Sequence, residues 1–398
     1  MQHVLYGDGI HDDLPAIQEL LDSGKSCVYL PPASKFYKIC GTIRIHSYQE
    51  LRLDRYTVIR LGEHCDCAML TNAEKEEWNS HISVCGGIWD MNHSAQSPNP
   101  AHFPVEGLLS KNLAENGFVP SNRYLPKNVY TGFCFIFSSI RHFYLGNLTI
   151  VNPVVYGADL AYVEDFTVEN IDFEYTEGSP KLWNLDGIHI EAGCQNGVVR
   201  NLKGACHDDT VAITSDDLFS GPIRNITVDG IYADGSHSAV RLLSKSTPVE
   251  NIHITNVFGS YYVYAIILSD YSSNGSDHPI FENITIDNIY ASLCPGTVDV
   301  PGNYEPLISI RSTGVPIHIR ELTLSRICRT ETHLAQPTIR ISENVTIDAL
   351  SVSDCVQTNR TGTPFPFIQC NGTIGKLFFS HIDTGADAFC EGNGTFSL

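Results

Sequence analysis

Long hydrophobic runs are missing from this sequence. No stretch approaches about 18 consecutive apolar residues, so we expect no membrane-spanning helix. The first residues, MQHVLYGDGIHDD, include no apolar signal segment, which predicts a cytoplasmic protein unless a leader has been removed. The 13 cysteines form no CxxC pair, and an odd number without a close framework favours reduced thiols over a disulfide scaffold.

Charge is scarce and mostly negative. Only 18% of the residues are charged and 42% are hydrophobic, so the chain can build a large core and is not expected to be disordered. The formal net charge of −20 argues against nucleic acid or an anionic membrane as the main partner. The spacings HxH and HExxH are absent, as is a glycine-rich loop between strand and helix. We therefore predict neither a metal site nor a nucleotide cofactor.

A degenerate phrase recurs instead of helical periodicity. Examples are GNLTIVNP, DFTVENIDF, RNITVDGIY, ENIHITNVF and ENITIDNIY, in which alternating aliphatic residues are followed by Asn, Asp or Gly. The central hydrophobe returns at intervals of about 30 residues, the range of stacked supersecondary units. The predicted positions of this hydrophobe are Val168, Val199, Val228, Ile254, Ile286, Leu324, Ile347 and Phe379.

Strand-rich repeats of this length predict an all-β, single-stranded, right-handed parallel β-helix that forms one domain over residues 1–398. A β-sandwich is the alternative, but the hairpin signals that it needs are sparse. Residues 1–45 form an N-terminal cap region, in which an amphipathic helix from Asp12 to Gly24 covers the open end. Its apolar face is predicted to hold Ala16, Ile17, Leu20 and Leu21. Residues 91–130, rich in Pro, Asn and Ser, read as an inserted loop that either walls a binding site or is simply solvated.

Three aspartates accompany two of the predicted strands. They occur in WNLDGIHI, residues 183–190, and HDDTVAI, residues 207–213. Aligning consecutive coils by their apolar alternation places Asp186 beside Asp209, followed by Ser238 and then Tyr264. Asp208 lies next to this row, as does His237 one coil later. Arg241 falls beside Ala212 and His189.

Crowded carboxylates suit glycosidic bond hydrolysis. Mutual repulsion raises the pKa of at least one of them, giving one protonated acid and one ionised base. Asp186 and Asp209 have core-facing parity, so we expect both to precede their strands and to reach an external groove, because an unpaired buried carboxylate is costly. Aspartates at coil turns also satisfy backbone groups, and that purely structural alternative remains open.

NLDGIHI resembles the NTDG motif of glycoside hydrolase family 28, the polygalacturonase family, and HDDTVAI resembles its DD motif. YGDGIHDDLPAIQELL is similar to the entry of pectate-lyase-like β-helices, and GNLTIVNP to the phrase xLTIxNSP of family 28. The resemblance implies that Asp208 is the general acid and that Asp186 and Asp209 activate water in an inverting hydrolysis. It also implies that Arg241, in AVRLL, binds substrate and that Tyr264 lines the leaving-group side.

The chain departs from the family in two motifs. The lysine of the family's RIK is Leu243 here, and no GHG occurs, so His237 is the candidate equivalent of the family's histidine. Further substrate-binding candidates are His207 and His189, as hydrogen-bond donors to sugar hydroxyls, together with Asn184 and, by stacking on a sugar ring, Trp183. For each histidine an ordinary surface role is the alternative, and for Trp183 a packing role.

The sequence therefore predicts an inverting, polygalacturonase-like glycoside hydrolase acting on pectin-derived or related plant oligosaccharides. An exo or trimming mode follows from the missing signal segment and the inserted loop. One alternative is a polysaccharide lyase or uronate epimerase, for which Arg241 is the only evident residue that could neutralise a uronate carboxylate. The other is a non-catalytic carbohydrate-binding, tailspike-like protein. The partner in each case is an oligo- or polysaccharide, and the sequence does not fix the oligomeric state.

Overall fold

The computed structural model describes residues 4–74, 77–99, 119, 123–125, 129–176, 184–270, 277–296 and 305–396. The chain forms two compact units, one of residues 1–190 with 194–198 and one of residues 191–193 with 199–398. They are called the N-terminal unit and the C-terminal unit below. A single domain over 1–398 remains a prediction.

The N-terminal unit begins with one helix, followed by short strands. Its elements are α1 Leu14–Asp22, β1 Cys27–Leu30, β2 Tyr37–Ile39, β3 Ile43–Ile45, β4 Gln49–Leu53, β5 Val58–Leu61, β6 Leu70–Asn72, β7 Asn79–Cys85, β8 Ile88–Asp90, the 3₁₀ turn His93–Ala95, β9 Phe135–Val151 and β10 Ala158–Glu174. The boundary between the units runs through β11 Ile188–Glu191 and β12 Gln195–Lys203.

Parallel pairing between coils builds the N-terminal unit. Val28, Leu51, Val84, Leu145 and Val168 pair in sequence through β1, β4, β7, β9 and β10, and all five are buried. The early coils add two further columns of paired strands, β3–β6 and β2–β5–β8, so each coil turns through three strands. Apolar side chains on successive strands therefore stack into a continuous core.

The predicted cap helix is present as α1. Ala16, Ile17 and Leu21 are buried on it, whereas Leu20 is only half-buried. Gly24 follows the helix with φ +75°, a left-handed conformation that glycine adopts at low cost at a helix end.

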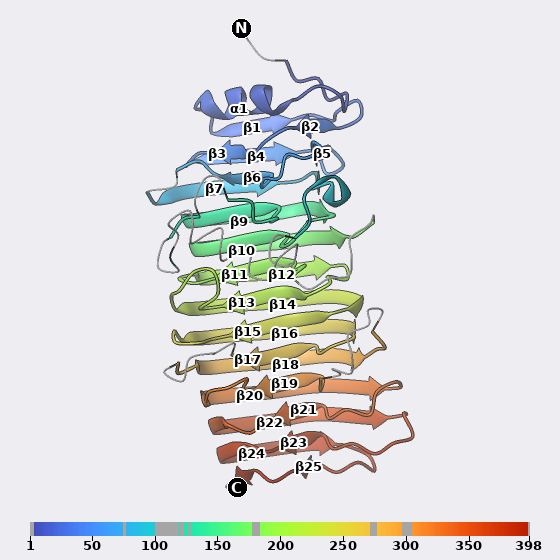
Figure 1. Cartoon of the computed structure of the whole chain (residues 1–398). Helices are drawn as coiled ribbons and strands as arrows, with labels where there is room; N and C mark the ends of the chain where they lie inside the picture. Colours follow the sequence, from blue (N-terminus) through green and yellow to red (C-terminus); the bar gives the residue numbers. More distant parts are fainter. Residues whose placement is uncertain are drawn as a thin grey trace. The chain divides into compact units, whose positions relative to one another are not determined.

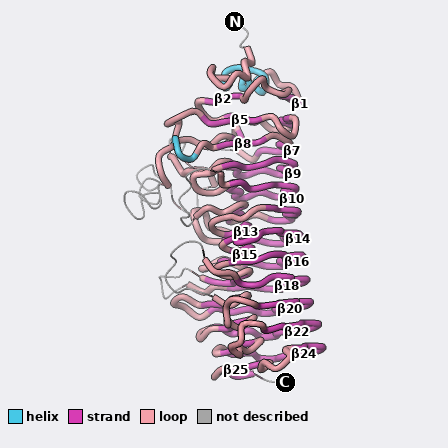
Figure 2. The backbone as a smooth tube through the Cα atoms, turned by 90° about the vertical axis from the view of Figure 1, so that its right-hand side faces the viewer, coloured by secondary structure: helices cyan, strands magenta, loops and turns pink. Residues whose placement is uncertain are grey.

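The C-terminal unit continues the same pattern (Figures 1 and 2). Its strands are β13 Asp209–Thr214, β14 Ile223–Ser236, β15 Ser238–Leu243, β16 Val249–Tyr261, β17 Ile266–Ser269, β18 Ile280–Leu293, β19 Ile308–Arg311, β20 Ile317–Glu331, β21 Ile339–Ile341, β22 Val345–Asn359, β23 Ile368–Cys370, β24 Thr373–Asp383, β25 Cys390–Glu391 and β26 Thr395–Phe396. Figure 1 shows these strands in successive layers, and each strand pairs in parallel with its equivalent in the next coil, as β13 does with β15 and β14 with β16.

The recurring hydrophobe occupies one buried column of the C-terminal unit, with one correction. Val228, Ile254, Ile286 and Leu324 pair in that order, as predicted. The next member is Val352 and not Ile347, because Leu324 pairs with Val352 and Ile347 pairs with Ile319. The prediction therefore aligned the phrase ENVTIDALS with the wrong part of the coil, because its Ile347 belongs to the column of Ile319 and not to that of Leu324.

Asparagines occupy bends within the long strands β14, β16 and β18. Asn225, Asn251 and Asn283 all have φ near +55°, a region that asparagine tolerates better than most residues. Their side chains bond in a ladder, Asn251 donating to Asn225 and Asn283 to Asn251, both at 2.9 Å. The Asn of the repeat phrase is thus explained by backbone conformation and side-chain stacking.

Part of the predicted insertion packs against the N-terminal unit. The side-chain amides of Asn92 and Gln96 donate to the carbonyl oxygens of Leu61 and Gly62, and His93 bonds to the Pro153 carbonyl oxygen. This first segment is therefore anchored by buried side chains, while Ser94, Ser97 and Pro98 are exposed. Residues 100–118, 120–122 and 126–128 lie outside the described part of the chain, so a wall around a binding site remains a prediction.

Each unit is a stack of parallel coils, and the fold class is the predicted right-handed parallel β-helix. Among the residues that the structure describes, no helix has the length and apolar character needed to cross a membrane. All 13 cysteines lie in the described part of the chain, and each is a free thiol.

Candidate functional site

Asp209 is surrounded by side-chain hydrogen-bond donors. It is the first residue of β13 and only 1% exposed. Its Oδ1 accepts hydrogen bonds from the Ser238 hydroxyl at 2.5 Å and the Tyr264 hydroxyl at 3.0 Å, and Nε of Arg241 lies 3.1 Å from Oδ2. All of these neighbours are donors, so they suit an ionised carboxylate.

The strand register explains why these side chains meet. Asp209 pairs with Ser238 and Ala212 with Arg241 in β13 and β15, while Val240 pairs with Ile266 in β17. This is the register that apolar alternation predicts, and it is confirmed for these three strands. Tyr264 precedes β17, and Nη2 of Arg241 donates to its hydroxyl at 2.9 Å.

Burial is the main electrostatic influence on Asp209. Desolvation raises the pKa of its carboxyl above 3.8, and the nearby Asp208 raises it further. The Arg241 guanidinium, the His237 imidazole and the Ser238 hydroxyl act in the opposite direction. The sequence predicted a raised pKa from repulsion between carboxylates, whereas burial is the larger cause here.

The expectation that Asp209 reaches an external groove is not met, because it is part of its strand and almost wholly buried. Asp208, immediately before the strand, is 7% exposed. The burial cost that motivated the expectation is offset by the donors around Asp209.

His237 stands beside Asp208. Its Nδ1 lies 3.4 Å from Oδ1 of Asp208 and 3.0 Å from Oγ of Ser238. Because Ser238 gives its one hydroxyl proton to Asp209, we infer that Nδ1 of His237 carries a proton and donates it to Ser238. The rings of Tyr262 and Tyr264 meet the imidazole edge-on, at centroid distances of 5.3 and 5.8 Å.

Asp208, Asp209 and His237 each offer one ligand atom, and these atoms all lie within 4.8 Å of one another. Two carboxylates and an imidazole are a donor set that divalent cations accept. The sequence predicted no metal site. These residues come from two coils, so a spacing motif would not have signalled the set.

In the N-terminal unit, Asp186 pairs with His189. Oδ2 of Asp186 lies 2.6 Å from Nδ1 of His189, and both side chains are buried. The Tyr156 ring stacks on the imidazole at 4.2 Å. His189 was expected to project outward to solvent; it is 2% exposed instead, because β11 is covered on both faces. A location of Asp186 next to Asp209 remains a prediction.

The structure says less about the remaining candidate substrate-binding residues. His207 is partly exposed beside Asp208, and Asn184, with φ +65°, is a half-buried turn residue. Trp183 lies outside the described residues. Leu243, which replaces the family's lysine, is fully buried. The functional assignments of all these residues remain predictions.

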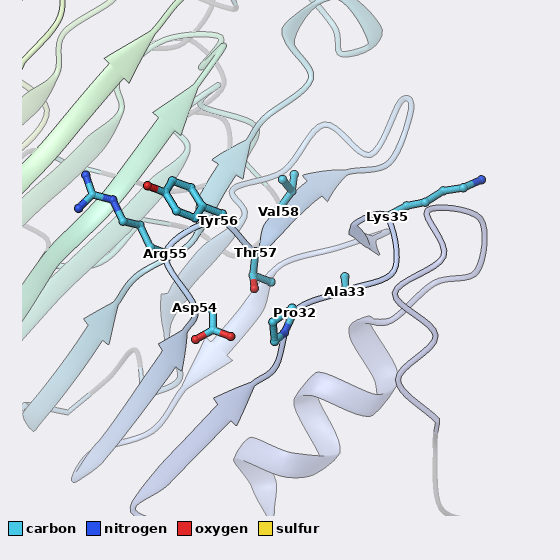
Figure 3. Close-up of a pocket in the computed structure, with 8 residues that line it drawn as sticks. All are labelled: Pro32, Ala33, Lys35, Asp54, Arg55, Tyr56, Thr57 and Val58. Carbon is cyan, nitrogen blue, oxygen red and sulfur yellow. The ribbon is translucent and has the colours of Figure 1, made fainter.

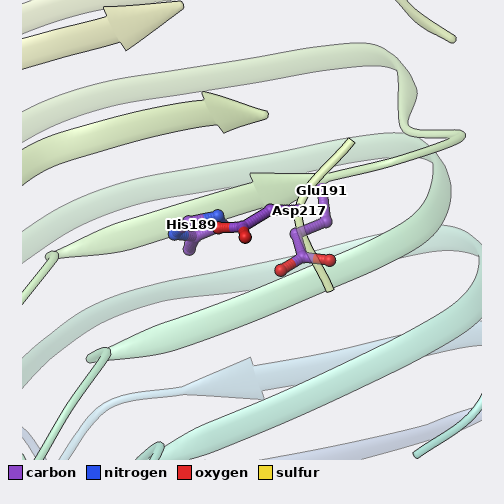
Figure 4. A group of neighbouring side chains, drawn as sticks. All are labelled: His189, Glu191 and Asp217. Carbon is purple, nitrogen blue, oxygen red and sulfur yellow. The ribbon is translucent and has the colours of Figure 1, made fainter. Parts of the chain in front are cut away.

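Sequence reasoning missed two further carboxylates of the C-terminal unit. Figure 4 shows Glu191 and Asp217, whose oxygens lie within 4.8 Å of each other, together with His189. Oε2 of Glu191 accepts the backbone N–H of Phe219 at 2.9 Å. Neither residue belongs to a recognisable motif, and the apolar repeat pattern gives no signal for them.

Proteins similar to this chain are found by comparison of structures and not by comparison of sequences. No model of a known protein family matches the chain, and no curated protein matches its sequence. A family 28 exopolygalacturonase of Yersinia enterocolitica has a TM-score of 0.60 and 16% identity, covering 98% of this chain and 76% of that one.

Two other solved structures are similar in the same degree. The endo-xylogalacturonan hydrolase of Aspergillus tubingensis has a TM-score of 0.63 and 15% identity, covering 98% of each chain. The A-module of mannuronan C-5 epimerase AlgE4 of Azotobacter vinelandii has a TM-score of 0.56 and 14% identity, covering 98% of this chain and 97% of that one. At these identities the likeness establishes the fold. The chain thus has the β-helix fold of family 28 polygalacturonases, and the resemblance predicted from its motifs is confirmed at that level.

Proposed function

We propose that the protein is a glycoside hydrolase of the family 28 type. The observation that carries the proposal is the convergence of Asp208, Asp209 and His237, whose ligand atoms lie within 4.8 Å of one another. The fold and the NLDGIHI and HDDTVAI motifs agree with it. A pair of carboxylic groups with different environments is what glycosidic hydrolysis requires.

In the proposed mechanism Asp208 is the general acid, which protonates the glycosidic oxygen as the bond breaks. His237 faces Asp208 through Nδ1 and stabilises the carboxylate that remains after proton transfer. Asp209, held as an acceptor by Ser238 and Tyr264, takes a proton from the attacking water. The resemblance to the family implies that Asp186 shares this role with Asp209.

Inversion rests on the resemblance and not on a measured separation. One oxygen of Asp208 lies within 4.8 Å of one of Asp209. Acid and base in most inverting glycosidases stand roughly 6.5–9.5 Å apart. The anomer of the first product is therefore a direct test of this part of the proposal.

The charges around the three residues favour an oligosaccharide with few carboxylates. Arg241 is engaged with Asp209, and Leu243 offers no charge where the family has a lysine. A net charge of −20 further disfavours a polyanion. We propose pectin-derived or related plant oligosaccharides as substrates, cut in an exo or trimming mode. The solved neighbours include both an exopolygalacturonase and an endo-xylogalacturonan hydrolase, so the proposed mode rests on the sequence.

Release of reducing ends from a panel of pectic and neutral oligosaccharides tests the proposal. The wild type is compared with Asp208→Asn and with Asp234→Asn, an exposed aspartate of the same unit that lies outside the site. We expect turnover of at least one substrate, a loss of about 100-fold or more in Asp208→Asn, and no loss in Asp234→Asn. Equal rates in wild type and Asp208→Asn would show that the acid is wrongly assigned. Binding without turnover by any variant would favour the non-catalytic alternative.

A further inference from the structure

The N-terminal unit has a shallow groove that none of the predicted catalytic residues lines. It has a volume of about 500 Å³ and crosses β4, β7, β9 and β10. Its lining includes the rings of Tyr48, His81 and His142. It also includes residues that pair across neighbouring strands, Ser83 with Tyr144 and Tyr144 with Thr167.

The three rings form a continuous row along the coil stack. The centroids of Tyr48 and His81 lie 5.1 Å apart with nearly parallel rings, and those of His81 and His142 lie 4.5 Å apart. Tyr48 is 66% exposed and stands at the end of the row, so one of its faces is open to solvent. An open aromatic face can stack on the apolar face of a pyranose.

The backbone at this row is unusual for such large side chains. Tyr48, His81 and His142 have φ values of 64°, 53° and 60°. At the same point of the repeat phrase the C-terminal unit uses asparagine, at Asn225 and Asn251. A bulky residue such as Tyr48 is an outlier in this region, and retained outliers of this kind are concentrated at functional sites.

Several polar groups of the groove lining have no partner within the described residues. His81 and His142 use only Nδ1, toward Ser80 and Asp165, so each Nε2 is available to a ligand. The hydroxyls of Ser83 and Thr167 make no hydrogen bond within the described part of the chain. Ring faces alternating with hydroxyls and imidazole nitrogens are suited to a polyol.

The charge of the groove selects among saccharides. Glu50 and Asp165 are the charged groups among the lining residues, which include no lysine or arginine. A polyuronate would meet these carboxylates, with no lysine or arginine among the lining residues to offset them. The groove spans three coil intervals of about 4.8 Å each, enough for a short oligosaccharide.

A second hollow of the same unit lacks these properties. It has a volume of about 380 Å³ and Tyr56 is its one aromatic residue (Figure 3). Its cationic side chains Lys35 and Arg55 extend in opposite directions in Figure 3, so they do not converge on a ligand.

We propose that the groove of Tyr48, His81 and His142, which none of the predicted catalytic carboxylates lines, binds a short neutral oligosaccharide. This inference does not depend on the hydrolase proposal. Such a site would hold a glycan on the N-terminal unit whether or not the protein cleaves it.

Calorimetric titration tests the inference with four probes: galactotetraose, xylotetraose, cellotetraose and trigalacturonate. The test variant is His81→Asn with His142→Asn, because asparagine is the residue that this fold uses at the corresponding turns. The control is Tyr56→Asn, which removes an aromatic ring that is 78% exposed elsewhere on the unit. All proteins carry Asp208→Asn, so turnover does not consume the probes.

We expect at least one neutral tetrasaccharide to bind, with affinity lost at least tenfold in the double variant and unchanged in Tyr56→Asn. Any binding of trigalacturonate is expected to be the same in all three proteins. Ser83→Gln, which fills the groove without altering the turn, should reproduce the loss if the double variant folds poorly. Absence of neutral-oligosaccharide binding, or equal binding by the double variant and the control, would overturn the inference.

Discussion

At the scale of single residues, Asp209 illustrates how a buried charge is made tolerable. Desolvation raises the pKa of its carboxyl, while Arg241, Ser238 and Tyr264 supply the donors that an ionised carboxylate needs. Ser238 also accepts from His237, so its hydroxyl links Asp209 to the histidine beside Asp208. We interpret Ser238 as a positioning residue of the proposed site.

Replacing Ser238 by alanine tests this role. The variant removes a hydrogen bond to a carboxylate, and such bonds contribute about 1.5–3 kcal/mol, so we expect turnover to fall roughly 10- to 100-fold. Because the Ser238 hydroxyl lowers the pKa of Asp209, its removal raises that pKa further. Asp209 then becomes protonated at higher pH, so the acidic limb of the kcat/KM profile should move to higher pH.

Ser236→Ala is the matched control for this measurement. Ser236 is equally buried in the same segment, but its hydroxyl donates to the Cys206 carbonyl oxygen at 3.1 Å and not to the carboxylates. Its pH profile should coincide with that of the wild type. An identical shift in both variants would mean that Ser238 acts only through general packing.

At the scale of the element, the bends within the long strands depend on asparagine. Asn251 combines a left-handed backbone with two ladder hydrogen bonds, to Asn225 and from Asn283. Asn251→Ala should lower the free energy of unfolding by about 1–3 kcal/mol, since alanine has a Cβ that is strained there and no amide. Asn251→Gly keeps the backbone freedom and loses only the amide, so its loss should be smaller. Urea unfolding gives the order, and an alanine variant as stable as the glycine variant would contradict the backbone explanation.

The pairing of strands could be predicted from the sequence because alternation has a strict period. Val211, Val240 and Ile266 align as the apolar pattern predicts, which places Asp209, Ser238 and Tyr264 in one row. The helix α1 and its buried face also follow from periodicity, apart from Leu20. These features follow from the local spacing of apolar residues, which can be read directly from the sequence.

What covers each face of a strand could not be predicted from the same rules. His189 alternates with apolar neighbours and was assigned to solvent, yet it is buried against Asp186 and Tyr156. Alternation tells which side a residue points to, but not whether a neighbouring turn or loop closes over that side. The misplacement of Ile347 has a related cause, since one coil has several corners with similar apolar pairs.

At the scale of the whole molecule, charge and fold limit the range of functions. The chain shares its β-helix fold with an endo-xylogalacturonan hydrolase and with a mannuronan epimerase, so the fold alone does not decide the chemistry. The net charge of −20 and the engagement of Arg241 with Asp209 leave little to neutralise a uronate. A lyase or epimerase needs that neutralisation, which is why hydrolysis is the better proposal.

The central claim is that the carboxylates gathered by stacked coils hydrolyse a glycosidic bond with inversion. The most direct test is a proton NMR time course of the wild type acting on an oligosaccharide that it turns over. The account predicts that the first product carries the opposite anomeric configuration to the bond cleaved, and that mutarotation follows later. A first product with retained configuration, an unsaturated product or an epimerised sugar would contradict it.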